Sequence, residues 1–298
     1  MAAGLIARCL CSIAPGAARR FYYWHRNQCI RRPRWFRPIA WTPVVTLRDG
    51  MRLRVSFRDV HGMNLITTGE YEPDLTDKIK ETLRAGDVFV DVGANMGFFS
   101  IVASRIVGPD GLVIAIEPSR AMLPRLIANL ELNGCDNVVI LSHALSDHSV
   151  IAKLRMAPFY NSGVASLDDI PPAQGAPLCP VSAVPYDTLA RTCNLPHKVS
   201  CIKIDTEGHD LSVLKGMRNL LTANDTIKVF CELSPQWYDV SELVAFMSEL
   251  GFGGNCSRNG EWISLRDGLP DQQCNALFQR NLAESAVRSC TDTVQSSV

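Results

Sequence analysis

Hydrophobic and polar positions follow one another in a pattern that predicts strands and helices in alternation. After Gly86, short apolar runs are each followed by a stretch in which apolar residues recur every three or four positions, the spacing of one buried helix face. Pro124 should kink or delay the first turn of the helix that contains it. We therefore expect strands at 87–91, 112–117, 137–141, 199–205 and 227–233, and helices at 97–107, 119–132, 210–221 and 240–250.

This alternation predicts an α/β fold in which a mostly parallel, doubly wound sheet carries helices on both faces. Asp-Gly and Asn-Gly pairs at 49–50 and 259–260 suit the tight turns of antiparallel hairpins. Outside the alternating region we expect a hairpin over 44–57, a helix over 74–83, a long irregular proline-rich insertion over 158–182 and a terminal hairpin from 251–256 and 261–265. The expected organisation is a basic arm (1–43), a hairpin and helix (44–84), the core domain (85–283) and a loose tail (284–298).

Composition excludes several classes of protein. Apolar residues make up 47% of the chain and charged residues 20%, so an ordinary core can form and general disorder is excluded. No run of about 18 apolar residues predicts a membrane-spanning helix. Residues 1–48 include nine Arg and no Asp or Glu, so the rest of the chain carries a net negative charge. A mildly acidic body argues against a nucleic acid partner, since such partners bind clustered cations.

The arginine-rich arm and the cysteines bear on cellular location. Arg8 interrupts the first apolar stretch, which is a poor fit to a secretory signal. The arm combines arginine with aromatic residues, so it suits either contact with an anionic membrane surface or an organelle address, with a loosely ordered terminus as the alternative. The 11 Cys include no CxxC pair, and we interpret them as reduced thiols. We expect a cytoplasmic protein, with mitochondria as the alternative.

A strand running into a glycine-rich turn is the first feature that suggests chemistry. Residues 87–97 read DVFVDVGANMG, and Gly93 and Gly97 allow a ligand to approach the backbone at the start of a helix. The spacing differs from GxGxxG, which weakens a dinucleotide interpretation. The next strand ends in Glu117, an acid placed to accept two ribose hydroxyls. A ligand-free turn and a solvated charge are the structural alternatives, but together the two features favour a nucleoside.

Further blocks along the chain resemble a known family. They lie at 90–97, 117–119, 144–147, 161–163, 203–208, 213–216 and 232–235. In this order the chain resembles the FkbM-type S-adenosylmethionine-dependent methyltransferases, and residues 69–73 resemble the region before the domain in bacterial members. Pro124, Thr206 and His209 depart from the family pattern, which bears on substrate contacts more than on the fold.

The resemblance implies a class I methyltransferase (Rossmann-like) sheet of seven strands with a last antiparallel hairpin, and S-adenosyl-L-methionine as cofactor. It implies that Glu117 holds the ribose and that Asp205 faces the methyl-transfer site, at the carboxyl end of its strand. It further implies that the methionine part of the cofactor is surrounded by Asp91, Gly93, Ala94, Asn95 and Gly97. Near the adenine it implies Ala144 and Leu145, with Ser146 and Asp147 as further candidates.

The candidate catalytic residues are Asp205, Lys203 and Glu232. Lys203 lies two residues before Asp205, on the same side of the strand, so a buried salt bridge and a role near the substrate are both open. In one hypothesis Asp205, with Glu232 and Glu207, binds a divalent cation. In the other, Asp205 orients the acceptor or takes its proton without a metal. We favour the second, because Lys203 would repel a cation.

Further candidate positions are Tyr71, Glu72, His209 and the segment 161–163. Tyr71 and Glu72 could close over the cofactor, although Tyr71 suits a packing role equally well. His209 at a helix start is a surface residue or a base. Residues 161–163 could line the acceptor pocket or form a turn.

We therefore predict an S-adenosylmethionine-dependent methyltransferase acting on a hydroxyl of a small metabolite or sugar. The alternatives are methylation of nitrogen, or of a glycan or protein acceptor. A nicotinamide-dependent oxidoreductase is a less favoured class, because GxGxxG is missing. A catalytically silent nucleoside-binding protein is disfavoured by the three acids Asp91, Glu117 and Asp205.

Overall fold

A computed structural model describes residues 42–56, 59–156, 165–167, 177–258 and 260–280. The expected arm (apart from its last two residues), the candidate segment 161–163 and the expected tail lie outside these residues. In chain order the elements are β1 (Val44–Thr46), β2 (Arg52–Arg54), α3 (Val60–Thr68), α4 (Pro73–Thr82), β3 (Val88–Val92), α5 (Phe98–Val107), β4 (Leu112–Ile116), α6 (Leu123–Asn133), β5 (Val138–Leu141), β6 (Ala144–Leu145), β7 (Val150–Arg155), β8 (Leu178–Val184), α7 (Tyr186–Thr192), β9 (Cys201–Ile204), α8 (Asp210–Lys215), α9 (Arg218–Ala223), β10 (Lys228–Leu233), α10 (Val240–Glu249), β11 (Phe252–Arg258), β12 (Glu261–Ser264) and β13 (Cys274–Arg280).

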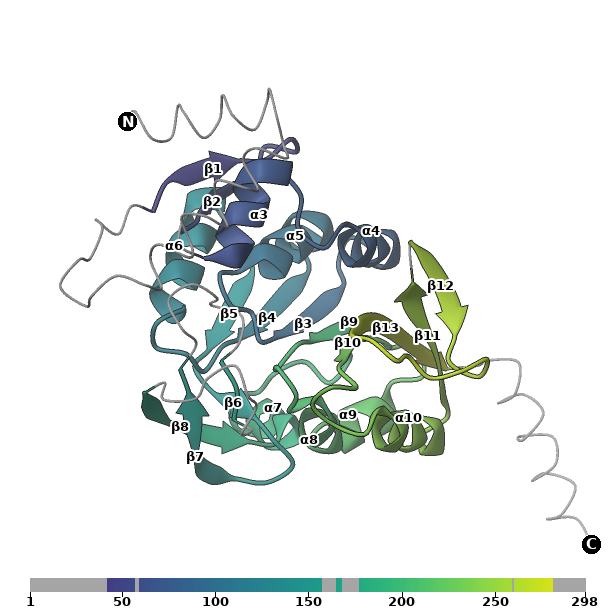
Figure 1. Cartoon of the computed structure of the whole chain (residues 1–298). Helices are drawn as coiled ribbons and strands as arrows, with labels where there is room; N and C mark the ends of the chain where they lie inside the picture. Colours follow the sequence, from purple (N-terminus) through teal and green to yellow (C-terminus); the bar gives the residue numbers. More distant parts are fainter. Residues whose placement is uncertain (1–41, 57–58, 157–164, 168–176, 259, 281–298) are drawn as a thin grey trace, which may run out of the picture.

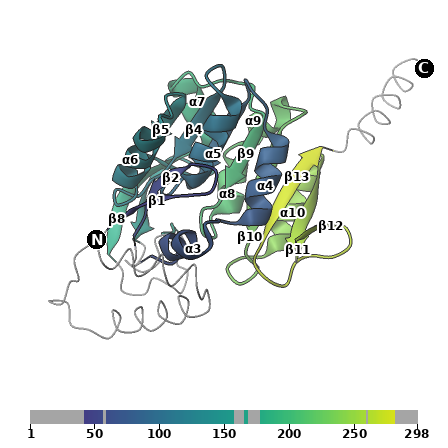
Figure 2. The ribbon, with the colours of Figure 1, turned by 90° about the horizontal axis from the view of Figure 1, so that it is seen from above.

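The described strands form a central sheet between two layers of helices (Figure 1). Its eight described strands run in the order β12-β11-β13-β10-β9-β3-β4-β5. Strands β10, β9, β3, β4 and β5 are parallel, whereas β13 is antiparallel to both of its neighbours. Helices α4, α5 and α6 cover one face and α7 to α10 the other (Figures 1 and 2). The predicted class I methyltransferase fold is confirmed, although the sheet has eight described strands where the resemblance implied seven.

Alternation along the parallel strands divides the core between the two faces. In β3, Phe89 packs in the cluster beneath α4, α5 and α6, while Val90 and Val92 pack in the cluster on the opposite face. All three side chains are buried, as expected for a strand covered on both sides. Asp91 points to the face of α5, where it lies opposite Lys203 in the register of β3 and β9. A charged pair is therefore placed inside the sheet–helix interface.

The structure corrects two predicted helix boundaries. Helix α6 begins at Leu123 rather than at 119, with Pro124 in its first turn, where proline is tolerated. The helix predicted over 210–221 is two helices, α8 and α9, separated at Gly216 and Met217. A Cβ on Gly216 would lie 2.1 Å from the carbonyl oxygen of Ser146, so this glycine permits a close approach between distant segments.

Several elements had no counterpart in the sequence prediction. The final strand β13 inserts between β10 and β11, so the predicted terminal hairpin, now β11–β12, lies at the sheet edge. Helices α3 and α7 were missed. The insertion expected to be irregular over 158–182 includes the first five of the seven residues of β8. Strand β8 pairs with β6 and β7 in a small separate sheet. No helix among the described residues is long and apolar enough to span a membrane.

Candidate active site

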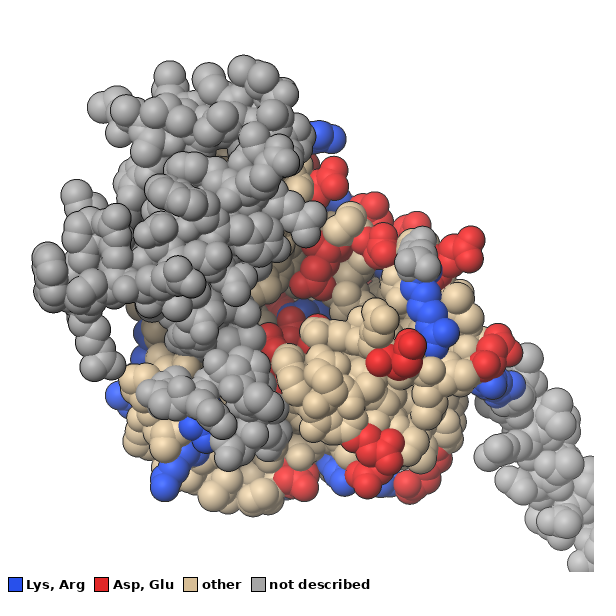
Figure 3. Space-filling view, viewed as in Figure 1, with Lys and Arg blue, Asp and Glu red and all other residues tan. Residues whose placement is uncertain are grey.

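A cavity of about 400 Å³ lies across the carboxyl ends of the parallel strands. Because β4, β3, β9 and β10 are consecutive neighbours, the cavity extends over about 14 Å of sheet. Acidic side chains gather around the hollow on this face of the molecule (Figure 3). Of the residues singled out in the sequence, the lining includes Tyr71, Glu72, Gly93, Asn95, Glu117, Ala144, Leu145, Asp205, Glu207, His209 and Glu232.

The glycine-rich turn after β3 is shaped by contact with the end of β9. Gly93 has φ 75°, and a Cβ there would lie 2.0 Å from the carbonyl oxygen of Asp205. Asn95 also has a positive φ, 50°, which asparagine tolerates better than most residues. Gly97 ends the turn at φ 88° and precedes α5. Glycine at position 93 therefore lets two strand ends meet at the floor of the cavity.

Glu117 is held by the backbone on both sides of the cavity floor. One carboxylate oxygen accepts a hydrogen bond from the Asn95 N–H at 2.8 Å, and the other accepts one from the Ser119 N–H at 2.7 Å. Burial raises the pKa of Glu117 to about 7, while the two N–H groups favour the ionised form. Each carboxylate oxygen keeps a further lone pair. The group can therefore accept two more hydrogen bonds from a ligand.

Lys203 lies behind the cavity rather than in its lining. Its Nζ contacts Asp205 Oδ2 at 3.2 Å, Asp91 Oδ1 at 3.9 Å and the Gly93 carbonyl oxygen at 3.4 Å. It also lies 5.3 Å from the centre of the Phe99 ring. The two carboxylates raise the pKa of Lys203 despite burial, which alone would lower it. The buried salt bridge, one of the two sequence alternatives, is confirmed.

Asp91 is fully buried and also lies outside the cavity lining. Its Oδ2 accepts a hydrogen bond from the Ser100 hydroxyl at 2.6 Å, which ties β3 to α5. Burial raises the pKa of Asp91 and Lys203 lowers it. Ala94 and Gly97 are likewise absent from the lining. Asp91, Ala94 and Gly97 therefore lie behind the glycine-rich turn, and the turn contributes Gly93 and Asn95 to the cavity lining.

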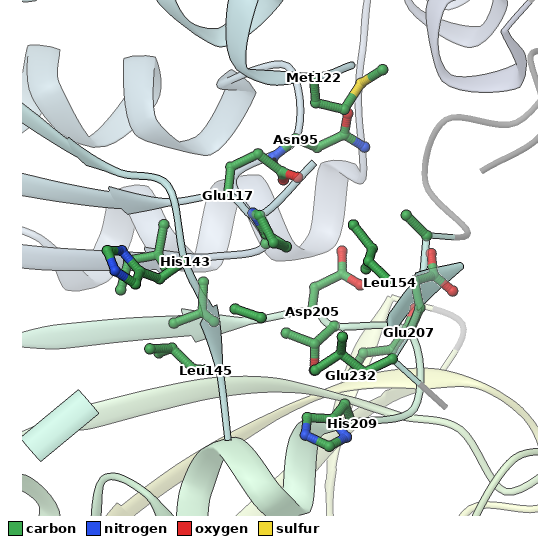
Figure 4. A pocket seen from close by; sticks show the side chains of 18 of the residues that line it. Asn95, Glu117, Met122, His143, Leu145, Leu154, Asp205, Glu207, His209 and Glu232 are labelled. Atoms are coloured by element: carbon green, nitrogen blue, oxygen red, sulfur yellow. Dashed lines mark hydrogen bonds between the residues drawn. The ribbon is translucent and has the colours of Figure 1, made fainter. Parts of the chain in front are cut away.

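Three glutamates accompany Asp205 at the other end of the cavity. Burial, reinforced by the charge of Asp205, raises the pKa of Glu207 to about 10 and that of Glu232 to about 8. The pKa of Glu72 is raised by the same two causes, and Lys203 lowers it. Figure 4 shows Glu207 and Glu232 apart from Glu117, with Asp205 between them. One end of the cavity thus concentrates proton-accepting groups.

The loop between α3 and α4 covers part of this acidic end. The Tyr71 hydroxyl lies 3.1 Å from His61 Nδ1, and its ring packs against Phe98 and Phe99 with centroids 5.0 and 5.9 Å away. Glu72 adopts a left-handed φ of 40°. The packing interpretation of Tyr71 is confirmed by its contacts with α5. Tyr71 also lines the cavity, and its closure over the cofactor stays a prediction.

Sequence reasoning missed several residues of the lining. His143 precedes β6, Met122 lies just before α6, and Trp237 follows β10. Gln273 arrives from the segment before β13 and donates a hydrogen bond to Glu232 Oε1. His209, the departure from the family pattern, lies in the cavity with Nε2 3.1 Å from the Ser146 hydroxyl. His209 was a candidate in the sequence, whereas the other four had no signal there, because their approach to the cavity depends on tertiary structure.

The residues present fit the expected cofactor at the Glu117 end. The Asn95 Oδ1 and His143 Nδ1 atoms are buried and have no hydrogen-bond partner within the described part of the chain, and both residues line the cavity. A nucleoside supplies ribose hydroxyls for Glu117 and polar atoms for these two groups. The volume also lies within the ordinary range for small-molecule sites. Among the described residues, no group of three His, Cys, Asp or Glu side chains has a metal-binding arrangement.

Comparison with known proteins gives matches over most of the core. The model of the Methyltransferase FkbM domain matches residues 91–253. The hexuronic acid methyltransferase AglP of Haloferax volcanii is 26% identical over 204 residues, covering 68% of this chain and 80% of AglP. The 23S rRNA (uracil(1939)-C(5))-methyltransferase RlmD of Psychrobacter arcticus is 35% identical over 94 residues, 32% of this chain and 17% of RlmD. The crystal structure of the FkbM methyltransferase from Methylobacillus flagellatus KT gives a TM-score of 0.42 at 16% identity, covering 72% of this chain and 52% of that one.

Proposed function

This chain belongs to the FkbM methyltransferase family, and on that premise we propose that it methylates a hydroxyl of a sugar or similar small metabolite. Transfer of a methyl group from S-adenosyl-L-methionine is the activity of the family. The sugar acceptor is supported by the similarity to a hexuronic acid methyltransferase over 68% of the chain. A nucleic acid acceptor is disfavoured because no Lys or Arg is among the described residues that line the cavity, so phosphates would have no cationic partner there.

The division of the cavity into two ends carries this proposal. At one end Glu117 retains two acceptor positions for ribose hydroxyls. At the other end Asp205, Glu207 and Glu232 surround space for an acceptor. A hydroxyl must lose its proton as it is methylated, so it needs a proton acceptor nearby. The arrangement therefore suits a hydroxyl acceptor held close to carboxylates.

The roles proposed for the residues follow from their positions. Gly93 and Asn95 would hold the methionine part of the cofactor, Glu117 the ribose, and Ala144 and Leu145 the adenine. When bound, the cofactor supplies an electrophilic methyl group on a positively charged sulfur. Asp205 would orient the acceptor and Glu232 would flank it.

Supporting residues act from behind this lining. Lys203 would position the Asp205 carboxylate and the Gly93 carbonyl group, which it contacts. Asp91, with Ala94 and Gly97, would maintain the turn that presents Gly93.

An amine acceptor is the second candidate. The carboxyl groups of Asp205, Glu207 and Glu232 line one end of the cavity, and their oxygens can accept hydrogen bonds from an ammonium group. The same groups could deprotonate that amine before transfer.

Location remains a prediction: cytoplasmic, or mitochondrial if the arginine-rich arm acts as an address, with a membrane-surface contact as a further role for the arm.

Turnover with a matched set of acceptors tests the proposal. Purified full-length protein would be incubated with methyl-labelled cofactor and methyl glucoside, methyl glucuronide, glucosamine or an RNA oligonucleotide. We expect label on a sugar hydroxyl, located by mass spectrometry and NMR, and its loss in Asp205→Asn. Label on the amine of glucosamine alone would select the second candidate. Label on RNA, or none on any saccharide, would contradict the sugar proposal.

A further inference from the structure

Glu207 differs from its acidic neighbours in having an unoccupied carboxylate. Asp205 is paired with Lys203 at 3.2 Å. Glu232 accepts hydrogen bonds from Gln273 and from the Ser234 hydroxyl. Within the described part of the chain, no hydrogen bond or ion pair reaches the Glu207 side chain, although it is largely enclosed and lines the cavity. Its lone pairs are therefore available to a ligand.

The backbone holds Glu207 in an unfavourable conformation at this position. Its φ is 54°, in the left-handed region, and Gly208 follows at 99°. The Ser166 hydroxyl donates a hydrogen bond of 2.8 Å to the Glu207 carbonyl oxygen, which fixes the loop between β9 and α8 from a distant segment. A strained non-glycine residue persists when its surroundings hold it, and such residues concentrate at functional sites. The loop thus presents the side chain to the cavity at a cost in backbone energy.

We propose that Glu207 is the catalytic base that takes the proton of the acceptor hydroxyl, an inference that rests on the proposed function. The hydroxyl oxygen forms a bond to the methyl carbon as its O–H bond breaks, and the proton passes to the Glu207 carboxylate. The carbon–sulfur bond breaks with its electron pair remaining on sulfur. One positive charge on sulfur and one negative charge on Glu207 are both neutralised, so the step is balanced in atoms and charge.

The charges that face Glu207 explain how it becomes a base. The carboxylates of Asp205, just after β9, Glu232 on β10 and Asp210 on α8 raise the pKa of Glu207, and the Lys203 ammonium group lowers it. Burial and these negative charges raise the pKa of Glu207 to about 10, so the free enzyme holds it protonated at neutral pH. A unit positive charge about 5 Å away, at an effective dielectric constant of about 20, lowers a carboxyl pKa by roughly two. A positively charged cofactor bound nearby should therefore lower the pKa of Glu207 and raise the ionised fraction that can act as a base.

The other groups at this end are less suited to the role. Asp205 is already engaged by the Lys203 ammonium group at 3.2 Å, so its carboxylate is less available to an acceptor. Glu232 is engaged by two hydrogen-bond donors. His209 has Nε2 within 3.1 Å of the Ser146 hydroxyl. Glu232 is the strongest rival, because its pKa is also raised, to about 8.

Calorimetric measurement of proton release tests the proposal without an acceptor. Binding of S-adenosyl-L-methionine and of S-adenosyl-L-homocysteine would be measured at pH 8.5 in buffers of different ionisation enthalpy. At this pH Glu232 is mostly ionised already, whereas Glu207 is not. The two ligands share the ribose, adenine and amino acid groups and differ in the charged methyl-bearing sulfur. We expect wild type to release roughly 0.7 proton more with the cationic ligand, for a pKa that falls by two.

Three variants decide which residue supplies that proton. Glu207→Gln should abolish the difference between the ligands, Glu232→Gln should retain it, and Glu242→Gln on the exposed face of α10 should match wild type. Persistence of the difference in Glu207→Gln, or its absence in wild type, would overturn the inference. Binding of neither ligand would instead contradict the proposed function itself.

A kinetic comparison with the best saccharide of the acceptor panel adds a second readout. Glu207→Gln should lower kcat by about 100-fold or more with little change in KM for the cofactor. Glu207→Asp retains a carboxyl group, so it should recover part of the rate and of the proton release, and it replaces the glutamine variant if that variant fails to fold. Wild-type kcat in Glu207→Gln would contradict the proposal.

Discussion

Replacing Glu117 by glutamine tests the cofactor end of the cavity most directly. In the structure each Glu117 oxygen accepts one backbone N–H, from Asn95 or Ser119, and keeps one lone pair for a ligand. Glutamine preserves the size of the side chain but replaces one oxygen by an NH₂ group. That group faces a backbone N–H and cannot accept a ribose hydroxyl. One backbone donor and one ligand hydroxyl therefore lose their acceptor.

The expected loss of affinity follows from these contacts. A hydrogen bond to a charged group contributes about 1.5–3 kcal/mol, so Glu117→Gln should weaken binding by about 10- to 150-fold. Wild-type affinity should also depend on pH, because the pKa of Glu117 is raised to about 7. A ligand that prefers the ionised form loses up to about tenfold in affinity per pH unit below that value. The glutamine variant lacks this titration.

S-adenosyl-L-homocysteine is the appropriate ligand, because it avoids the charge effect at the acidic end. Its affinity would be measured by calorimetry from pH 5.5 to 8.5 for wild type, Glu117→Gln and the control Glu131→Gln on the exposed side of α6. Thermal melts of all three would verify folding. Unchanged affinity in Glu117→Gln at pH 8, or the same pH dependence as wild type, would refute the assignment of Glu117 to the ribose.

Three further outcomes are expected from the same geometry. Gly93→Ala should unfold more readily than Gly86→Ala in chemical denaturation, since both residues have positive φ but only the first would bring a Cβ within 2.0 Å of another atom; equal effects would contradict the close contact. Lys203→Met should lower the free energy of unfolding by about 3 kcal/mol or more, because it leaves the buried Asp91 carboxylate without its ion-pair partner. A clearly smaller loss in chemical denaturation would contradict a charged pair at this position. The free energy of unfolding should fall as pH rises from 6 to 10. Carboxyl groups such as Glu207 have a higher pKa in the folded than in the unfolded state. Their contribution to stability is therefore complete below about pH 4 and is lost as pH rises through the folded pKa. Thermal melts should show this trend in wild type and a flatter one in Glu207→Gln.

The parts of the site that the sequence predicted share a local origin. A strand followed by a glycine-rich turn and a helix is encoded within about ten residues, so the position of Gly93 required no tertiary information. Glu117, Asp205 and Glu232 come at or near strand ends, and parallel strands bring such ends to one edge. Periodicity and strand order together therefore locate most of the cavity floor.

The parts that were missed depend on contacts between distant segments. The helix predicted over 210–221 is divided into α8 and α9. Asp187, from α7, accepts hydrogen bonds from the Asn219 and Leu220 N–H groups at 2.9 and 3.1 Å and so caps the beginning of α9. Gln273 enters the cavity only because β13 inserts beside β10. A pattern of apolar residues contains no signal for either event, since both concern which segments meet.

The contacts that Asp205 and Glu232 already make within the chain bear on the choice between a metal and a metal-free acceptor site. A divalent cation would require several ionised carboxylates with free lone pairs on a common centre. Asp205 instead lies 3.2 Å from the Lys203 ammonium group, which would repel the ion. Glu232 is already engaged by Gln273 and a serine hydroxyl. The same burial that raises the pKa values of the glutamates makes them hold protons rather than metal at neutral pH. The donor set therefore suits a metal-free site, in which a carboxyl group that is ionised when the cationic cofactor binds can take the proton of a hydroxyl acceptor.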